Sequence, residues 1–257
     1  NSVQEALDGH PNDLTRPLLA PVLQPLYQAY KTLEKARARR GAVDLDLPER
    51  KVMLKDGEVQ DISKRMRFDS HKLIEELMIL ANVAVATVLE KHDQELLYRI
   101  HAKPDNARWA SIREFLLELG LRPKYGLSPS PKDMQALLKS AEGNDAEQLV
   151  NEIVLRSMSQ AAYSPDNVGH FGLALERYAH FTWPVRRYAD LIVHRALIRA
   201  FKLGEDGLRD HDITRLPITG QHISDRERVA QSAERETIDR YIALYMADKV
   251  GATFGAR

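Results

Sequence analysis

Cysteine is absent from this chain of 257 residues. Its absence excludes disulfide scaffolds, zinc sites built from thiolates, and enzymes with a cysteine nucleophile. The composition is typical of a protein from a reducing compartment, and we expect a cytoplasmic location. Hydrophobic residues make up 44% of the chain, which excludes a disordered protein and is sufficient for a buried core.

Long hydrophobic runs are also missing. The longest extends from Leu77 to Leu89 and includes Asn82, whereas a membrane-spanning helix needs roughly 20 apolar residues. We therefore expect no membrane partner. The first residues lack the basic-then-apolar pattern of a secretion signal, and the chain begins with Asn1 rather than Met, so we expect it to start inside a longer protein.

An excess of charge of one sign is missing as well, since 37 Lys and Arg balance 37 Asp and Glu. A protein that binds nucleic acid through its overall charge is usually strongly basic, so any such binding would have to be local. The basic residues do gather, within residues 35–40, 64–67 and 186–199. These clusters are either solvated helix faces with balancing acids or local anion-binding surfaces.

Apolar residues at helical spacing predict that helices dominate the chain. Short alternating stretches predict strands near 43–62, 98–103 and 169–175, the first folded into a hairpin about Lys55-Asp56-Gly57. We therefore expect an α+β fold in which a mixed sheet, with further strands upstream of the chain, is flanked by helices. The predicted helices span residues 25–39, 69–91, 107–120, 131–143, 144–163, 184–204 and 222–248.

The helix predicted at 69–91 is apolar on all sides of its middle, which is typical of a buried helix. Glu75, Glu76 and Asn82 interrupt its apolar sequence. Buried polar groups need partners, so these side chains are expected either to form hydrogen bonds in the packing or to belong to a site.

The stretch from residue 168 to 195 concentrates groups that can hold an anion. Pro184 suits the first position of a helix, and the helix is expected to start there with Arg186 and Arg187 in its first turn. Helix amides and guanidinium groups both bind phosphate, while the His and Tyr side chains before the helix supply donors and aromatic faces for bases. The alternative is that the arginines form ion pairs with Asp190 and neighbouring acids.

The same stretch, HFGLALERYAHFTWPVRRYADLIVHRAL, resembles the signature of the ribonuclease II and ribonuclease R family of 3′-to-5′ exoribonucleases, whose catalytic domain is the RNB domain. The segments DLDLPE, DSHKLIEELMILANVA, YRIHAKP and AERETIDRYIALYM resemble the same family in the same order. The resemblance implies that residues 1–248 are the C-terminal portion of the catalytic domain. Residues 249–257 would then be a linker or the first strand of an S1 domain.

The function that this resemblance implies is processive hydrolysis of single-stranded RNA from its 3′ end to nucleoside 5′-monophosphates, with Mg²⁺. Arg186 corresponds to the family arginine at the scissile phosphate, and Glu234 and Glu75 match family acids near the bound RNA end. The structural alternatives are that Glu75 is a helix-start acid favoured by the dipole and that Glu234 is one of many acids on a solvated helix. The expected catalytic residues are therefore Arg186 and Glu234, and the expected RNA-binding residues are Glu75, His170, Tyr178, His180 and Arg187.

The family's metal-binding aspartates, of the pattern D-x-x-x-x-x-D-D, have no counterpart here. The ligands of Mg²⁺ are therefore expected upstream of residue 1, and no metal ligand is assigned within the chain. Asp44, Asp46 and Glu49 could imitate such a set, but they match a different family segment. We expect a monomer whose partners are single-stranded RNA and the N-terminal part of the same protein as a separate piece; the alternative is a non-catalytic RNA-binding relative.

One further departure lies beside the arginines, because the family has Ser-Pro where this chain has Trp183-Pro184. A serine there would cap the helix, whereas tryptophan cannot, so Trp183→Ser is predicted to stabilise the helix start. Alternatively, Thr182 takes the capping role, or the indole stacks on a base or on Arg187.

Overall fold

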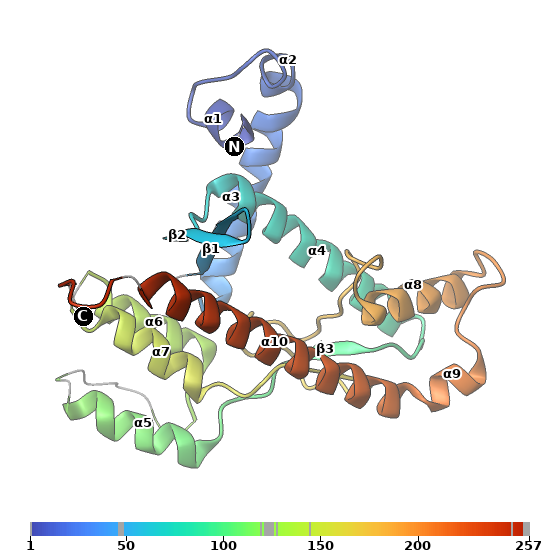
Figure 1. Cartoon of the computed structure of the whole chain (residues 1–257). Coiled ribbons are helices and arrows are strands. Elements are labelled where there is room, and N and C mark those ends of the chain that lie inside the picture. Colours follow the sequence, from blue (N-terminus) through green and yellow to red (C-terminus); the bar gives the residue numbers. More distant parts are fainter. Residues whose placement is uncertain are drawn as a thin grey trace.

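Helices dominate the chain, whose structure is a computed structural model that describes residues 2–45, 49–118, 120, 126, 128–143, 145–247 and 249–253. Figure 1 shows an N-terminal arm, built from α1, α2 and part of α3, that stands above a body crossed by α4 and the long α10. The described helices are α1 (Ser2–Leu7), α2 (Arg16–Leu18), the π-helical turn η1 (Leu19–Leu23), α3 (Gln24–Arg40), α4 (Asp69–Lys91), α5 (Asn106–Glu118), α6 (Pro131–Ala141), α7 (Glu147–Ser157), α8 (Tyr188–Phe201), α9 (Asp210–Thr214) and α10 (Leu216–Ala247).

The predicted hairpin is confirmed. Strand β1 (Arg50–Lys55) pairs antiparallel with β2 (Glu58–Lys64). The turn between them places Asp56 at φ 54° and Gly57 at φ 85°. Two successive residues with positive φ give the turn whose twist matches that of the flanking strands, and Asp-Gly is a preferred sequence for it.

The α+β class is confirmed, but the described strands do not form the expected mixed sheet. They pair as two antiparallel two-stranded sheets, the hairpin and the pair of β3 (Tyr98–Ile100) with β4 (Ala162–Ser164). The strand predicted at 169–175 is wrong, because His170 makes only isolated bridges, to His101 and to Leu175. Residues 169 and 174 both take positive φ values, so this segment turns back on itself instead of extending.

Three helix predictions need correction at their ends, and the one at 184–204, observed as α8 (Tyr188–Phe201), is treated with the site below. The helix predicted to reach residue 163 ends at Ser157, since residues 162–164 pair with β3 as β4. The last helix begins at Leu216 rather than at residue 222, because residues 216–221 are helical as well and follow α9 after a single residue. Beyond α10, residues 249–251 form a turn, and residues 254–257 lie outside the described residues, so the predicted linker or strand at 249–257 remains a prediction.

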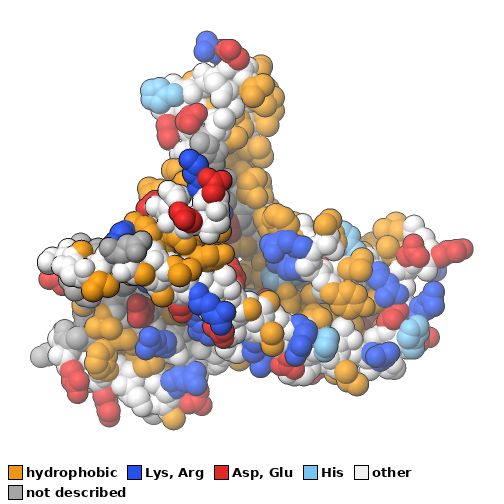
Figure 2. Space-filling view, viewed as in Figure 1, with side chains coloured by type: hydrophobic (Ala, Val, Ile, Leu, Met, Phe, Trp, Pro, Cys, Tyr) orange, Lys and Arg blue, Asp and Glu red, His pale blue; other side chains and the backbone are white. Residues whose placement is uncertain are grey.

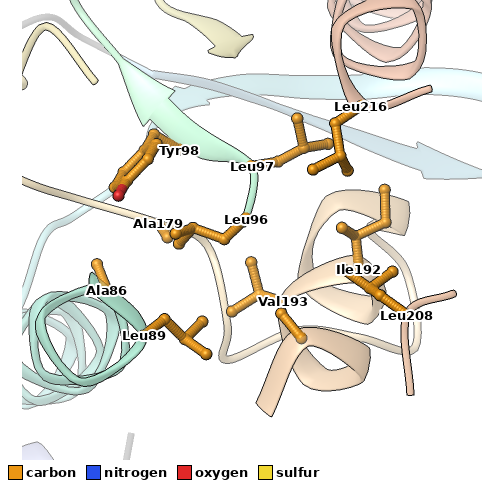
Figure 3. Close-up of a cluster of buried hydrophobic side chains, with 11 residues drawn as sticks. Ala86, Leu89, Leu96, Leu97, Tyr98, Ala179, Ile192, Val193, Leu208 and Leu216 are labelled. Carbon is orange, nitrogen blue, oxygen red and sulfur yellow. The ribbon is translucent and has the colours of Figure 1, made fainter. Parts of the chain in front are cut away.

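The core consists of two clusters of buried apolar side chains. Figure 3 shows the first, where residues from α4, the segment before β3, α8 and the start of α10 meet. Leu89, Leu97 and Val193 are completely buried in it. The second cluster joins α5, α6 and α7 around Trp109, which is also completely buried. The first cluster includes Ile192 and Val193, so it anchors α8, the helix that directly follows the loop with Arg186 and Arg187.

The long helix α10 packs closely on β4 through Gly220. A Cβ atom at this position would lie 2.6 Å from the carbonyl oxygen of Tyr163, so only glycine permits the approach. One turn later, the Oγ of Ser224 accepts a hydrogen bond from the backbone N–H of Tyr163 at 2.9 Å and donates one to the Gly220 carbonyl at 2.7 Å. This contact attaches the N-terminal third of α10 to the second sheet.

Apolar side chains remain exposed on α4 and on the N-terminal arm. The prediction that α4 is buried on all sides is wrong, because Ile74 is 53% and Leu80 is 50% exposed. On the arm, a stripe at four-residue spacing is exposed, and Figure 2 shows hydrophobic side chains gathered along one side of this arm. The members of this arm stripe are Leu14, Leu18, Val22 and Leu26.

Candidate functional site

The loop before α8 carries the two arginines in a conformation that the sequence did not predict. Pro184 starts one helical turn, in which the N–H groups of Arg186 and Arg187 donate to the Trp183 carbonyl at 3.2 and 3.1 Å. The turn then stops, because Arg187 is extended at φ −124° and ψ 117° and serves as the N-cap of α8. The predicted helix start at residue 184 is wrong, and the two arginines precede the helix.

Asp190 explains the interruption. Its carboxylate is fully buried in the first turn of α8. It accepts a hydrogen bond from the Trp183 N–H at 2.8 Å and pairs with the Arg187 guanidinium, whose Nε lies 2.8 Å from Oδ2 and whose second contact, to Oδ1, is 2.9 Å. A buried carboxylate needs such partners. For Arg187, the structure therefore shows the ion pair that was the alternative to phosphate binding.

Arg186 is held differently. Its guanidinium carbon lies 4.4 Å from the centroid of the Trp183 ring, a cation–π contact. The residue is exposed, and its side chain forms no ion pair or hydrogen bond with any of the described residues. Because no acid among the described residues occupies its N–H donors, Arg186 has the chemistry of an anion-binding group. The stacking partner of the indole is Arg186 and not Arg187.

The expected capping role of position 183 fails with the helix start. Trp183 lies five residues before Tyr188, the first residue of α8, so a serine there would not cap that helix. The substitution Trp183→Ser is no longer predicted to stabilise it. Thr182 does not cap it either, because its Oγ1 is buried without a hydrogen-bond partner among the described residues.

Behind the arginine loop, five rings form a continuous series of edge-to-face contacts, which we call the aromatic ladder. Neighbouring ring centroids lie between 5.0 and 5.6 Å apart. Its last contact is reinforced by a hydrogen bond of 2.9 Å between the Tyr163 hydroxyl and Nδ1 of His180. In order, the ladder consists of His101, His170, Tyr178, His180 and Tyr163.

The ladder histidines are neutral. Burial lowers the pKa of His170 to about 3 and the pKa of His180 to about 2. The positive charges of Arg187, Arg99 and Arg186 act on His180 in the same direction, which also shows that the arginine loop and the ladder are close. At neutral pH the positive charge of this region therefore resides on the arginines, and the imidazoles serve as neutral hydrogen-bonding groups.

Asn82 connects α4 to the ladder. It is buried, donates from Nδ2 to the Tyr178 hydroxyl at 3.0 Å, and accepts the Phe181 N–H at 2.9 Å. The sequence-based expectation that Asn82 has buried partners is confirmed. Tyr178 is itself buried, and its hydroxyl is used inside the protein. Burial is the main cause that raises the pKa of Tyr178, and the negative charge of Glu75 adds to the rise.

Two functional candidates were not found from the sequence. Arg99 on β3 stacks over the Tyr163 ring at 4.6 Å and forms a two-pronged ion pair with Glu227 of α10, at 2.6 and 3.1 Å. His101 occupies one end of the ladder. Both residues lie two positions apart in the segment YRIHAKP. This spacing places two side chains on the same side of an extended chain, and it is the sequence feature from which a shared site could have been predicted.

Glu75 lies in a separate network of charges on α4. Its carboxylate contacts Arg67 at 2.8 Å and Arg37 at 3.7 Å, and its side chain is 41% exposed. The neighbouring Glu76 is buried and pairs with Arg37 at 2.9 Å. Glu75 is therefore a partnered but accessible acid, close enough to the ladder to act on the pKa of Tyr178.

Glu234 stands apart from the arginine loop. It is exposed on α10 and lines a groove of about 1260 Å³. Arg186 and the ladder do not line this groove, which we call the α10 groove, so the structure does not bring Glu234 and Arg186 into one pocket. The described residues that line it include Arg50, Lys64 and Arg65 of the hairpin region, Phe68 and His71 near the start of α4, Glu152 of α7, and Gln231, Arg235 and Asp239 of α10.

The described residues do not suit a magnesium ion. They contain no group of three or more His, Asp or Glu side chains that could hold a metal ion. Asp44 pairs with Arg67 at 3.2 Å and Glu49 with Arg65 at 3.2 Å, and Asp46 lies outside the described residues.

Among the described residues, no helix is long and apolar enough to cross a membrane.

Comparison with known proteins places the chain in a family. The model of the RNB domain matches residues 1–202. Ribonuclease R of Vibrio parahaemolyticus is 42% identical over 239 residues, which are 89% of this chain and 29% of the relative. Ribonuclease R of Escherichia coli is 41% identical over 241 residues, covering 90% of this chain and 30% of the relative. The chain thus spans about three tenths of the length of these relatives.

The fold agrees with this assignment. Mycoplasma genitalium RNase R, solved in complex with ribose methylated single-stranded RNA, matches with a TM-score of 0.91 and 26% sequence identity, over 98% of this chain and 40% of that one. The arginine loop, the ladder segment and α4, all described above, lie inside the part of the chain that the domain model matches. The chain belongs to the RNB domain family, and it is similar to the ribonucleases R.

Proposed function

We propose that this chain forms the C-terminal portion of the catalytic domain of a 3′-to-5′ exoribonuclease that hydrolyses single-stranded RNA processively to nucleoside 5′-monophosphates. The observation that carries the proposal is Arg186, an exposed guanidinium with no acidic partner among the described residues, in a loop fixed by the buried Asp190. Arginine binds phosphate through charge-assisted hydrogen bonds. In this role Arg186 binds the phosphate at the scissile bond and stabilises the charge that develops there.

The aromatic ladder supports an RNA path beside Arg186. His101, Tyr163 and Tyr178 are buried, so they would support the surface beside this path and would not themselves stack on bases. His170 and His180, neutral at pH 7, would contribute hydrogen bonds, while Arg187 fixes the loop through Asp190. Tyr178 would act mainly by packing, since its hydroxyl is bound to Asn82. The solved complex of Mycoplasma genitalium RNase R with ribose methylated single-stranded RNA is in keeping with this proposal.

The two glutamates have supporting roles in this proposal. Glu75, accessible beside the ladder, would act near the bound RNA end. Glu234 lies on the α10 groove, and a direct part in the reaction at Arg186 would require the RNA or another segment to connect the two places. We therefore propose that Arg186 is the main residue at the scissile phosphate, and that Glu234 contacts RNA bound in the α10 groove.

Hydrolysis of this type needs Mg²⁺, which stabilises the attacking and leaving oxygens when bound. The described residues do not provide its ligands, so we propose that they come from upstream of residue 1. That N-terminal part of the domain is also the proposed protein partner. The exposed arm stripe and the exposed Ile74 and Leu80 of α4 are apolar surfaces that such a partner would cover. We further propose a monomer in the cytoplasm.

The test is a nuclease assay on the full-length protein that contains this chain. A 5′-labelled single-stranded oligoribonucleotide should be shortened from its 3′ end without intermediates of middle length, and the product should be the nucleoside 5′-monophosphate. Chelation of Mg²⁺ should stop the reaction. The corresponding oligodeoxyribonucleotide is the substrate control, and Arg240→Ala is the protein control, since the Arg240 side chain is 81% exposed on α10 outside the groove.

Two outcomes would contradict the proposal. Binding of RNA without any hydrolysis would identify a non-catalytic RNA-binding relative, which is the alternative. Hydrolysis by Arg186→Ala at the rate of the unchanged protein would remove the role of this arginine while leaving the activity assigned.

A further inference from the structure

The indole of Trp183 and the guanidinium of Arg186 form a cation–π contact of 4.4 Å in which Asp190 takes no part. We propose that Trp183 is a positioning residue, which holds the Arg186 side chain against its ring so that the N–H edge of the guanidinium is presented to an RNA phosphate. This inference rests on the proposed function, in which Arg186 binds that phosphate.

The ring has a fixed base. The Trp183 N–H donates to the buried Asp190 at 2.8 Å, and the Trp183 carbonyl accepts the N–H groups of Arg186 and Arg187. Its backbone is therefore bound on one side to Asp190 in the first turn of α8, a helix that packs in the core, and on the other to the two arginines just before that helix. The indole is therefore attached to a backbone segment with a fixed position, within reach of the Arg186 guanidinium.

Stacking and phosphate binding use different parts of the guanidinium. The guanidinium carbon lies 4.4 Å from the centroid of the indole. A guanidinium that rests on a ring through its flat face leaves the N–H groups in its own plane free for phosphate oxygens. An arginine already ordered in this way loses less conformational freedom when its ligand binds. Arg187, in contrast, has its plane occupied by Asp190, so within this loop only Arg186 can present a full edge.

The stacked contact itself can be tested by fluorescence. The chain has two tryptophans, of which Trp109 is completely buried and Trp183 is 41% exposed, so quenching by acrylamide reports mainly on Trp183. Arg186→Ala should increase this quenching because it uncovers one face of the indole. Arg240→Ala should leave it unchanged. Equal quenching in the Arg186→Ala variant and the unchanged chain would mean that the two groups do not stack in solution, which would overturn the inference.

The positioning role is tested by binding of a labelled single-stranded oligouridylate to the chain. Trp183→Ala should weaken binding about two- to fivefold, the range of an exposed cation–π contact, and Trp183→Phe should restore most of the loss because it keeps an aromatic face. On the Arg186→Ala background, Trp183→Ala should cause no further loss, since the two residues act as one unit. Thermal unfolding of each variant should show the same cooperative transition.

Other outcomes have distinct meanings. If Trp183→Ala weakens binding equally with and without Arg186, the indole contacts a base directly and the positioning inference is wrong. If Arg186→Ala binds RNA as tightly as the unchanged chain, the phosphate role of Arg186 in the proposed function fails, while the quenching measurement still decides whether the stack exists. If Trp183→Ala unfolds, the same comparison of RNA affinity is made with Trp183→Phe. A change in affinity that is equal with and without Arg186 would again contradict the inference.

Discussion

The arginine loop and the α10 groove both contain residues expected to act on RNA, but they hold their charges in opposite ways. In the loop, Asp190 is completely buried and fixes both Arg187 and the backbone of Trp183. In the groove, Glu234 is exposed among other exposed acids and bases. Buried charges determine a geometry because any change leaves a partner desolvated, whereas exposed charges adjust affinity. The loop is therefore the part of the site whose shape the fold enforces.

The largest expected effect comes from the buried side of this comparison. Asp190→Ala leaves the Arg187 guanidinium and the Trp183 N–H without their acceptor, and removal of one partner of a buried ion pair typically costs about 3–5 kcal/mol. Urea unfolding of the chain measures the loss. A change of under about 1 kcal/mol would indicate that water reaches Arg187 and that the loop is not rigid.

Next is Asn82→Ala, which probes the link between α4 and the ladder. The substitution leaves the Tyr178 hydroxyl and the Phe181 N–H without the partners that Asn82 provides, at about 1–3 kcal/mol for each buried group. Urea unfolding should show a loss in this range. Gln221→Ala is the control, since Gln221 is exposed and bonds only within α10, to Asp225, among the described residues; an equal loss there would make the effect nonspecific.

The ladder histidines predict a dependence of stability on pH. In the folded chain the pKa of His180 is about 2 and that of His170 about 3, both below the unfolded value of roughly 6.5. As the pH falls below that value the unfolded chain binds protons that the folded chain does not, so the free energy of unfolding decreases, by about 2 kcal/mol per histidine at pH 5.

This slope can be assigned by substitution. Unfolding of His180→Gln at pH 7.5 and pH 5.0 should show a smaller loss on acidification than the unchanged chain, whereas His10→Gln, an exposed position on the N-terminal arm, should show the same loss. A stability that did not change between the two pH values would mean that the ladder histidines are solvated in the folded chain.

The smallest effects belong to exposed charges. Glu234→Gln should change the free energy of unfolding by less than about 0.5 kcal/mol, and Asp210→Asn, which breaks an ion pair of 2.7 Å to Arg199 with Asp210 89% exposed, by less than about 1 kcal/mol. Because Glu234→Gln should leave the fold intact, any effect of this substitution on RNA binding or hydrolysis would report on the role of Glu234 itself and not on a loss of folded protein. A large loss of stability from Glu234→Gln would contradict the view of the α10 groove as a solvated surface.

Sequence reasoning succeeded where the signal was local. The helix over residues 69–91, the hairpin turn at Asp56-Gly57 and the need of Asn82 for buried partners all follow from spacing, turn chemistry and the cost of buried polar groups. The family was also predictable, because several ordered motifs carry it.

The failures have one physical cause, which is that long-range partners decide between local alternatives. Pro184 favours a helix start, but the buried Asp190 draws Arg187 into an extended conformation and delays the helix. Residues 162–164 continue a helical pattern, but they pair with β3. The roles of Arg99 and His101 depended on segments more than 60 residues away, which no local pattern reveals.

The close approach of Gly220 to Tyr163 has a mechanical consequence. Helix α10 has 32 residues and is about 48 Å long at 1.5 Å per residue. A change of its angle at the contact with β4 therefore moves the residues far from that contact. Glu234 lies ten residues beyond Ser224, about 15 Å along the axis. A larger residue at position 220 would tilt α10 against β4, and a tilt of about 10° would displace Glu234 by roughly 2–3 Å over that span. The smallest residue in the helix therefore sets the width of a groove that it does not line.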